Sequence, residues 1–218
     1  MNSEADAAPA TDPKEQLQQG LEELGLRLDR NARKRLLAFA DLLEKWNRVH
    51  NLTAVRETGQ MVVLHVLDSL SLLPHLDGVK TLLDVGSGPG LPGIPVAIAR
   101  PEIAVTLLDA SHKKAAFLEQ ARVELALANV SVVCERVEGW KTERRFDAVV
   151  SRAFADLVDF VDQAQHLVAP GGTLIAMKGV HPFEELARVP ATHRVSRVLE
   201  ISVPSLEAKR HLVFLEAA

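Results

Sequence analysis

The chain has 218 residues, of which 47% are hydrophobic and 25% charged, and it contains a single cysteine. This apolar fraction suffices for a sizeable core, and one cysteine excludes both an intramolecular disulfide framework and a cysteine-rich zinc site. The net charge of −4 is concentrated at one end, because residues 1–29 carry seven acids and two bases while the remainder sums to +1. Composition therefore permits a nucleic-acid partner without indicating one.

The first 13 residues are rich in alanine, proline and aspartate, which predicts a disordered tail over residues 1–13. They contain no basic segment followed by an apolar stretch, so they do not resemble a signal peptide. The most apolar helix-length stretch, residues 62–73, is well short of the roughly 20 residues that a membrane span needs. We therefore expect a soluble, cytoplasmic, monomeric protein without a membrane partner.

Residues 14–77 predict a helical extension. A first leucine repeat at helical spacing ends at Gly25, and a longer apolar stripe follows with Asp29 or Asn31 as its N-cap. A third segment, residues 60–73, is apolar on most faces, which is typical of a buried helix.

Residues 78–218 show a different sequence pattern, in which short apolar runs alternate with helical stretches. Such alternation predicts a parallel sheet covered by helices on both faces, as in a Rossmann-like α/β domain. A Pro-Gly-Gly turn at 170–172 precedes the fifth strand. The expected parallel strands are residues 81–85, 104–108, 130–134, 146–151 and 173–177; the helices are near 94–100, 112–128 and 157–168; and a terminal antiparallel pair is expected at 197–203 and 210–215.

The most informative segment is a glycine-rich turn that follows the first of these strands. Gly86, Gly88 and Gly90 allow positive φ angles and a close approach of the backbone to a ligand. Asp109 ends the next strand, 23 residues after Gly86, where a βαβ unit places a carboxylate beside a ribose. The competing interpretation of Asp109 is a cap for the following helix. Together these features predict a nucleotide-type cofactor site.

The type of cofactor follows from the details of the turn. The G-x-x-x-x-G-K-[ST] motif is absent, which excludes a P-loop nucleoside triphosphatase. A dinucleotide fingerprint fits poorly, because Pro89 lies between the glycines and two more prolines crowd the helix start. Residues 84–90, DVGSGPG, instead match the apolar-Asp-x-Gly-x-Gly-x-Gly loop typical of S-adenosylmethionine sites. The sequence favours this cofactor, with a nicotinamide-dependent oxidoreductase as the alternative.

Several blocks in fixed order, of which DVGSGPGLPGIPV at 84–96 is the longest, extend this match over nearly the whole chain. With them the sequence resembles the ribosomal small subunit methyltransferase G family, formerly called glucose-inhibited division protein B. The other blocks are Trp46-Asn47, Asn51-Leu52-Thr53, His65-x-x-Asp68-Ser69, Leu107-Leu108-Asp109, Lys113-Lys114-x-x-Phe117-Leu118, Ser151-Arg152-Ala153-Phe154 and Lys178-Gly179.

The resemblance implies a class I, Rossmann-like S-adenosylmethionine-dependent methyltransferase with an N-terminal helical extension. Its substrate would be N7 of a guanosine in 16S ribosomal RNA, and its partner that RNA or a 30S subunit assembly particle. The family's cofactor contacts map onto Gly86, Leu91, Val137, Glu138 and Arg152. The loop and ribose arguments add Gly88, Gly90 and Asp109 to the expected cofactor site.

Guanine N7 carries a lone pair and no proton, so this chemistry needs no general base, covalent nucleophile or metal. Orientation supplies most of the rate, and we expect no catalytic residue in the usual sense. Cys134 lies in an apolar strand pattern and is assigned to the core. Arg152 has four candidate partners: the cofactor carboxylate, a phosphate, guanine O6, or an acid in a surface ion pair. Phe154 fits either a stacked base or core packing.

His65 and Asp68 share a helical face and are interpreted as a structural hydrogen-bonded pair. For RNA binding, basic side chains should cluster around the cofactor cleft while the acids lie elsewhere. A non-enzymatic ribosome-assembly protein with the same fold is a third hypothesis. The candidate basic residues are Arg48, Arg56, Lys113, Lys114, Arg136, Lys178, Lys209 and Arg210.

Overall fold

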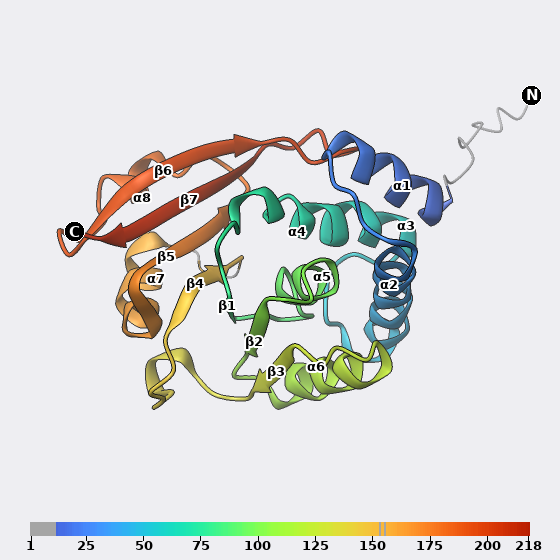
Figure 1. The fold of residues 1–218 in the computed structure, drawn as a ribbon, viewed down its shortest axis with the longest axis horizontal. Coiled ribbons are helices and arrows are strands. Elements are labelled where there is room, and N and C mark those ends of the chain that lie inside the picture. Colours follow the sequence, from blue (N-terminus) through green and yellow to red (C-terminus); the bar gives the residue numbers. More distant parts are fainter. Residues whose placement is uncertain (1–11, 153, 155) are drawn as a thin grey trace, which may run out of the picture.

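The computed structural model describes residues 12–152, 154 and 156–218 and contains a seven-stranded sheet of order β3-β2-β1-β4-β5-β7-β6 (Figure 1). The first five strands are parallel, and β7 pairs antiparallel with both β5 and β6, so the predicted terminal pair is confirmed. The strands are β1 (Thr81–Val85), β2 (Ala104–Leu108), β3 (Val130–Val133), β4 (Phe146–Ser151), β5 (Val168–Lys178), β6 (His193–Ile201) and β7 (Arg210–Ala217).

The alternation of side chains along the strands divides the core into two clusters, one on each face of the sheet. Leu82 and Leu107 face a cluster that includes the N-terminal helices, α5 (Gly93–Ala99) and α6 (His112–Glu124). Leu83 and Leu108 face the other, which is covered by α7 (Leu157–Ala164). Figure 1 shows these helices on the two sides of the sheet, which confirms the predicted α/β layering.

The first two helices follow from their capping residues. Asp12 caps α1 (Pro13–Glu23), and the Oδ1 of Asp29 accepts the Ala32 N–H at 2.7 Å to cap α2 (Arg30–His50). The predicted tail of residues 1–13 lies outside the described residues except for Asp12 and Pro13, which begin α1. The division of the chain at residue 78 stays a prediction, since the N-terminal helices share one core with α5 and α6.

The predicted buried helix at 60–73 is present, but its middle is wound differently from an α-helix. It consists of α3 (Thr58–Met61), a π-helical stretch η1 (Val62–Leu67) and α4 (Asp68–Leu70), followed by a 3₁₀ turn η2 (Leu73–His75). A π turn accommodates extra backbone per turn and is frequent at functional sites. Because this segment is buried almost all around, its sequence carries no periodic signal that could have indicated the π stretch.

The fifth strand is longer than predicted. The predicted turn at Pro170–Gly172 does not precede the strand but lies within it, because β5 pairs with β4 on both sides of this segment, with Phe146 opposite Val168 and Ala148 opposite Thr173. α6 ends at Glu124, earlier than predicted. Short 3₁₀ turns η3 (Val137–Gly139) and η4 (Gln165–Leu167) and a helix α8 (Phe183–Leu186) complete the described elements.

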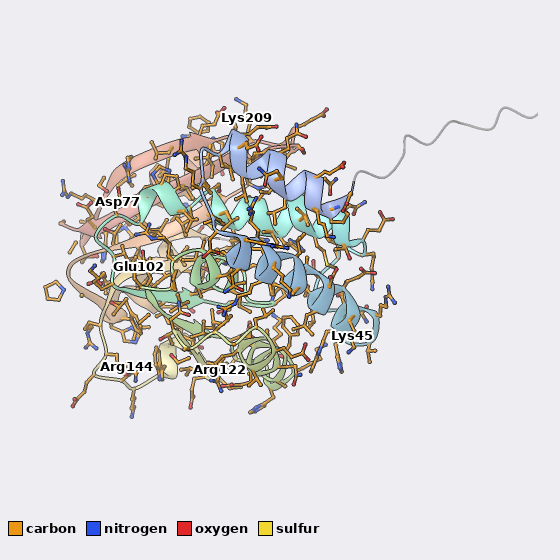
Figure 2. All side chains as sticks on the ribbon, turned by 45° about the vertical axis from the view of Figure 1, so that its right-hand side comes forward. Lys45, Asp77, Glu102, Arg122, Arg144 and Lys209 are labelled. Carbon is orange, nitrogen blue, oxygen red and sulfur yellow. The ribbon has the colours of Figure 1, made fainter. Side chains whose placement is uncertain are left out.

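Most charged side chains lie at the outside of this fold, and those labelled in Figure 2 point away from the core. In the part of the chain that is described, no helix is both long and apolar enough to cross a bilayer. The labelled residues are Lys45, Asp77, Glu102, Arg122, Arg144 and Lys209.

Candidate functional site

The glycine-rich turn after β1 lies at the carboxyl end of the parallel strands, where the strand order reverses between β1 and β4. Open α/β sheets bind ligands at this point. Gly86, Gly88 and Gly90 have φ angles of 69°, 57° and 86°, a region that side chains with a Cβ rarely adopt. The amide N–H groups of Gly86 and Ser87 donate to the Leu108 carbonyl at 2.8 and 3.1 Å, which ties the turn to the end of β2.

Asp109, directly after β2, holds the turn from the other side. Its Oδ2 accepts the Gly88 N–H at 2.9 Å, and its Oδ1 accepts the Ser111 N–H at 2.9 Å. The cap of α6 is Ser111, whose hydroxyl accepts the Lys114 N–H, so the interpretation of Asp109 as the cap is wrong. A carboxylate can accept about four hydrogen bonds, which leaves the buried Asp109 able to accept more from a ligand.

Asp84 lies in β1 beneath the turn and is fully buried. Its Oδ2 accepts the Gly93 N–H at 2.9 Å at the start of α5, and its Oδ1 has no partner among the described residues. Burial raises the pKa of this carboxyl to about 7, against the opposing effect of the Gly93 hydrogen bond and of the nearby Arg152 charge. An acid kept under such conditions is typical of a functional site.

Two clefts open on either side of the turn and share Gly86. We call them the β2–β3 cleft, with a volume of about 230 Å³, and the extension cleft, with a volume of about 220 Å³. The β2–β3 cleft is lined by Val85, Gly86, Leu108, Asp109, Ala110, Glu135, Arg136, Val137, Glu138 and Phe154. The extension cleft is lined by Leu52, Thr53, His65, Gly86, Ser87, Gly88, Pro89, Leu91, Lys114 and Arg152.

The N-terminal extension supplies one wall of the extension cleft through the loop after α2. Asn47, which is buried, accepts the Thr53 N–H on its Oδ1 at 2.9 Å and donates from Nδ2 to the Val55 carbonyl at 2.7 Å. The loop thus brings the Thr53 hydroxyl to 2.9 Å from the Nε2 of His65, on the π-helical stretch. Burial, followed by the charge of Arg152, lowers the pKa of His65 to about 4, so its ring is neutral at pH 7.

The predicted hydrogen-bonded pair of His65 and Asp68 is wrong. The π turn separates their directions, so that His65 contacts Thr53 while Asp68 binds Arg152 at 2.8 Å and Arg210 at 3.0 Å. Of the four candidate partners for Arg152, the structure therefore contains an acid, and this acid is buried instead of lying at the surface.

The expected separation of charges is found at one cleft only. Within the described residues, the charged groups that line the extension cleft are the bases Lys114 and Arg152. The β2–β3 cleft carries three acids, at 109, 135 and 138, against the single base Arg136. Acids therefore do lie beside the cofactor turn, contrary to the prediction, and one of them, Asp109, pairs with Lys114 of the extension cleft at 3.5 Å.

Similarity to known proteins identifies the sequence family. The family model described as rRNA small subunit methyltransferase G matches residues 32–213. The chain belongs to this family. A relative from Aromatoleum aromaticum, named ribosomal RNA small subunit methyltransferase G, is 56% identical over 204 residues, which cover 92% of this chain and 97% of that protein. One of the same name from Neisseria meningitidis serogroup B is 53% identical over 202 residues, covering 93% and 97%.

Solved structures support the fold assignment. The O-methyltransferase TomG from Streptomyces achromogenes, solved with S-adenosylmethionine, aligns with a TM-score of 0.59 at 15% identity and covers 95% of this chain and 99% of that one. The glycopeptide N-methyltransferase MtfA, also solved with this cofactor, gives a TM-score of 0.57 at 13% identity and covers 71% and 95%. The class I methyltransferase fold is confirmed, and the oxidoreductase alternative is wrong.

Methyltransferases of this family use S-adenosylmethionine, and the residues of the two clefts fit that cofactor. The β2–β3 cleft combines the apolar Leu108, Val137 and Phe154 with the carboxylate of Asp109, which suits a planar base and a ribose. The acids of this cleft suit the positive charge of the cofactor. The Oδ1 of the buried Asp84, for which the described residues offer no hydrogen-bond partner, leaves a polar acceptor beneath the turn. The residues that line this cleft therefore match the cofactor in chemical type.

The predicted cofactor residues fall into four groups in the structure. Asp109, Val137 and Glu138 line the β2–β3 cleft; Gly88, Leu91 and Arg152 line the extension cleft; and Gly86 lines both. Gly90 lies outside both linings, and a Cβ there would come within 2.4 Å of the Ile94 side chain. Direct contact of these residues with the cofactor stays a prediction. Thr53 was missed as a lining residue because only the fold brings it to the turn, whereas Lys114, one of the candidate basic residues, does line the extension cleft.

Two further assignments change. Cys134 lies just beyond β3 and is only half-buried, with its sulfur 3.3 Å from the Nδ1 of His112, so its assignment to the core is wrong. Phe154 forms part of the wall of the β2–β3 cleft and packs against Phe160 with ring centroids 5.1 Å apart. This position favours packing over stacking on a target base in the extension cleft.

We expect the substitution Gly93→Ala to lower the free energy of unfolding by about 1–3 kcal/mol, the usual cost of overpacking. Its Cβ would come within 2.2 Å of Leu107 Cδ2 and 2.8 Å of Asp84 Oδ2, beneath the turn. Urea denaturation checks this. The control Gly139→Ala adds a methyl group where nothing lies within 4 Å and should stay within about 0.5 kcal/mol of the wild type. Equal effects would contradict the proposed crowding.

Proposed function

We propose that the protein transfers the methyl group of S-adenosylmethionine to N7 of a guanosine in 16S ribosomal RNA. The observation that carries this proposal is the family match over residues 32–213, in a chain whose cofactor turn opens on a second, basic cleft. In this arrangement the β2–β3 cleft holds the adenosine end of the cofactor, and the extension cleft receives the target base. The substrate is the RNA or a 30S assembly particle, and the site of action is the cytoplasm.

The mechanism is a direct in-line displacement. When bound, S-adenosylmethionine supplies an electrophilic methyl group on a sulfonium, and guanine N7 has a free lone pair to attack it. The chain therefore has no proton to remove, and His65 in the wall of the extension cleft, whose pKa is lowered to about 4 and which is therefore a weak base, is not needed as one. Its task is to hold the base in line and to exclude water, and such orientation alone accounts for large rate factors.

The proposal is tested by mass spectrometry of digested 16S RNA. Deleting the gene in its host should remove one 7-methylguanosine from this RNA, and a plasmid copy should restore it. Restoration by a Cys134→Ala variant is also expected, because displacement at N7 uses no enzyme nucleophile. An unchanged 7-methylguanosine content after deletion would overturn the proposal, and impaired subunit assembly with unchanged methylation would favour the non-enzymatic hypothesis.

A further inference from the structure

Three segments far apart in the sequence meet in one ion cluster at the carboxyl edge of the sheet. Asp68 begins α4, Arg152 follows β4, and Arg210 begins β7. Oδ2 of Asp68 binds Nη1 of Arg152 at 2.8 Å, and Oδ1 binds Nε of Arg210 at 3.0 Å. Both oxygens of the one carboxylate are thus occupied by different guanidinium groups, which fixes the two arginines side by side.

The charges of this cluster do not balance. The Asp68 side chain is only 4% exposed, whereas those of Arg152 and Arg210 are 25% and 23% exposed. Among the ion pairs of the described residues, Asp68 is the only acid bound to either arginine. The cluster therefore carries one excess positive charge, and its acid is buried while parts of both arginine side chains reach solvent. A guanidinium has five N–H donors, of which each arginine spends only one on Asp68.

The position of the cluster relates it to the proposed RNA substrate. Arg152 lines the extension cleft, where Lys114 is the other charged residue, and Arg210 lies outside that lining but is joined to Arg152 through Asp68. Paired guanidinium groups match the oxygens of a phosphate, because their planar donors bind two oxygens at once. A buried ion pair by itself adds little net stability, so a second arginine on the same acid is poorly explained as a structural tie.

We propose that Asp68 is a positioning residue, which holds Arg152 and Arg210 as a clamp for a backbone phosphate beside the target nucleotide. This inference rests on the proposed function. The N-terminal extension then contributes to the RNA site at two places, the loop at Thr53 and Asp68 at the start of α4. Asp68 itself faces away from solvent and contacts the RNA only through the two arginines.

The substitution Asp68→Asn distinguishes positioning from simple electrostatics, because the two explanations predict opposite changes in RNA affinity. Removing a negative charge next to a polyanion should tighten RNA binding if the arginines act only through their charge. If Asp68 positions them, the affinity for 16S RNA should fall about tenfold, and the salt slope of binding should become shallower by about one, as for one lost phosphate contact. Filter binding over a range of salt concentrations measures both quantities.

The control is Glu200→Gln, which removes an exposed acid that pairs with Lys209, next to Arg210. It should leave RNA affinity unchanged or raise it. Arg152→Lys and Arg210→Lys keep the positive charge but lose the planar donors of the guanidinium group, and each should weaken RNA binding as Asp68→Asn does. When either is combined with Asp68→Asn, RNA binding should weaken little further. These lysine variants decide the question if Asp68→Asn does not fold.

The affinity for S-adenosylhomocysteine, measured by calorimetry, separates this proposal from a structural role. It should stay within about twofold of the wild type in Arg210→Lys, because Arg210 lines neither of the two clefts beside the cofactor turn. Tighter RNA binding in Asp68→Asn, or weaker binding of both RNA and S-adenosylhomocysteine in Arg210→Lys, would overturn the proposal. Because binding to 16S RNA is measured without turnover, a failure of the proposed methylation would be seen separately, in the RNA mass spectra.

Discussion

Replacing Asp109 by alanine should weaken the binding of S-adenosylhomocysteine by about 100-fold or more and abolish methylation. The carboxylate accepts the Gly88 and Ser111 N–H groups at 2.9 Å each and pairs with Lys114 at 3.5 Å, and it lines the β2–β3 cleft with capacity to accept further hydrogen bonds. Each hydrogen bond to a charged group contributes about 1.5–3 kcal/mol, so two lost bonds to a ribose amount to at least about 3 kcal/mol. Isothermal titration calorimetry measures the affinity directly.

Two matched variants separate the hydrogen bonds of Asp109 from its charge. Asp109→Asn keeps one oxygen acceptor and should lose less affinity than Asp109→Ala. Glu135→Gln removes the same charge from the same cleft, at a residue for which no hydrogen bond to the turn is found, and should change the affinity by no more than about threefold. Equal losses in Glu135→Gln and Asp109→Asn would show that the field of the cleft matters and would contradict the role of Asp109 as a ribose acceptor.

The local features of this site could be predicted because they depend on neighbouring residues. Gly86, Gly88 and Gly90 require positive φ angles wherever they lie in the fold, and an apolar run before them is enough to indicate the strand. The spacing to Asp109 follows from the dimensions of one βαβ unit. Prediction was therefore accurate for β1 and β2 and for the turn between β1 and α5, since this information lies within about 30 residues of sequence.

The extension cleft could not be predicted in the same way. Asp68, Arg152 and Arg210 come together from positions 84 and 142 residues apart, and no local pattern encodes such a contact. The pairing of β5 beyond Pro170 is likewise a long-range property, because β4 accepts strand residues on both sides of Pro170–Gly172. The apolar residues on most faces of the segment at 60–73 indicated its burial, while the π turn that separates His65 from Asp68 depends on packing from several sides.

A second large effect concerns stability and follows from the buried Asp84. Its pKa in the folded protein is raised from 3.8 to about 7, mainly by burial. Between pH 3.8 and about pH 7, the folded state therefore holds a proton on Asp84 that the unfolded state has already lost. The free energy of unfolding must then fall as the pH rises through this window. The full penalty, up to about 4 kcal/mol, is present above pH 7 and absent below about pH 4.

Asp84→Asn should remove this dependence, because the amide does not titrate. Its stability relative to the wild type should therefore be higher at pH 8 than at pH 5, by about 1–3 kcal/mol in urea denaturation without cofactor. Asp147→Asn is the control. Burial raises the pKa of Asp147, but hydrogen bonds from the Lys80 and Thr81 N–H groups outweigh it, so the net pKa is lowered.

Asp147 thus contributes stability that is lost only as the pH falls through its lowered pKa, so Asp147→Asn should cost the same amount at pH 5 and at pH 8. An Asp84→Asn variant with the same pH profile as the wild type would show that the Asp84 carboxylate is stabilised by groups other than Gly93 and Arg152. If the expected difference is found, the protein retains at the base of its cofactor turn an acid that destabilises the fold near neutral pH. Such a residue is explained by the site it supports, since an asparagine would serve the fold better.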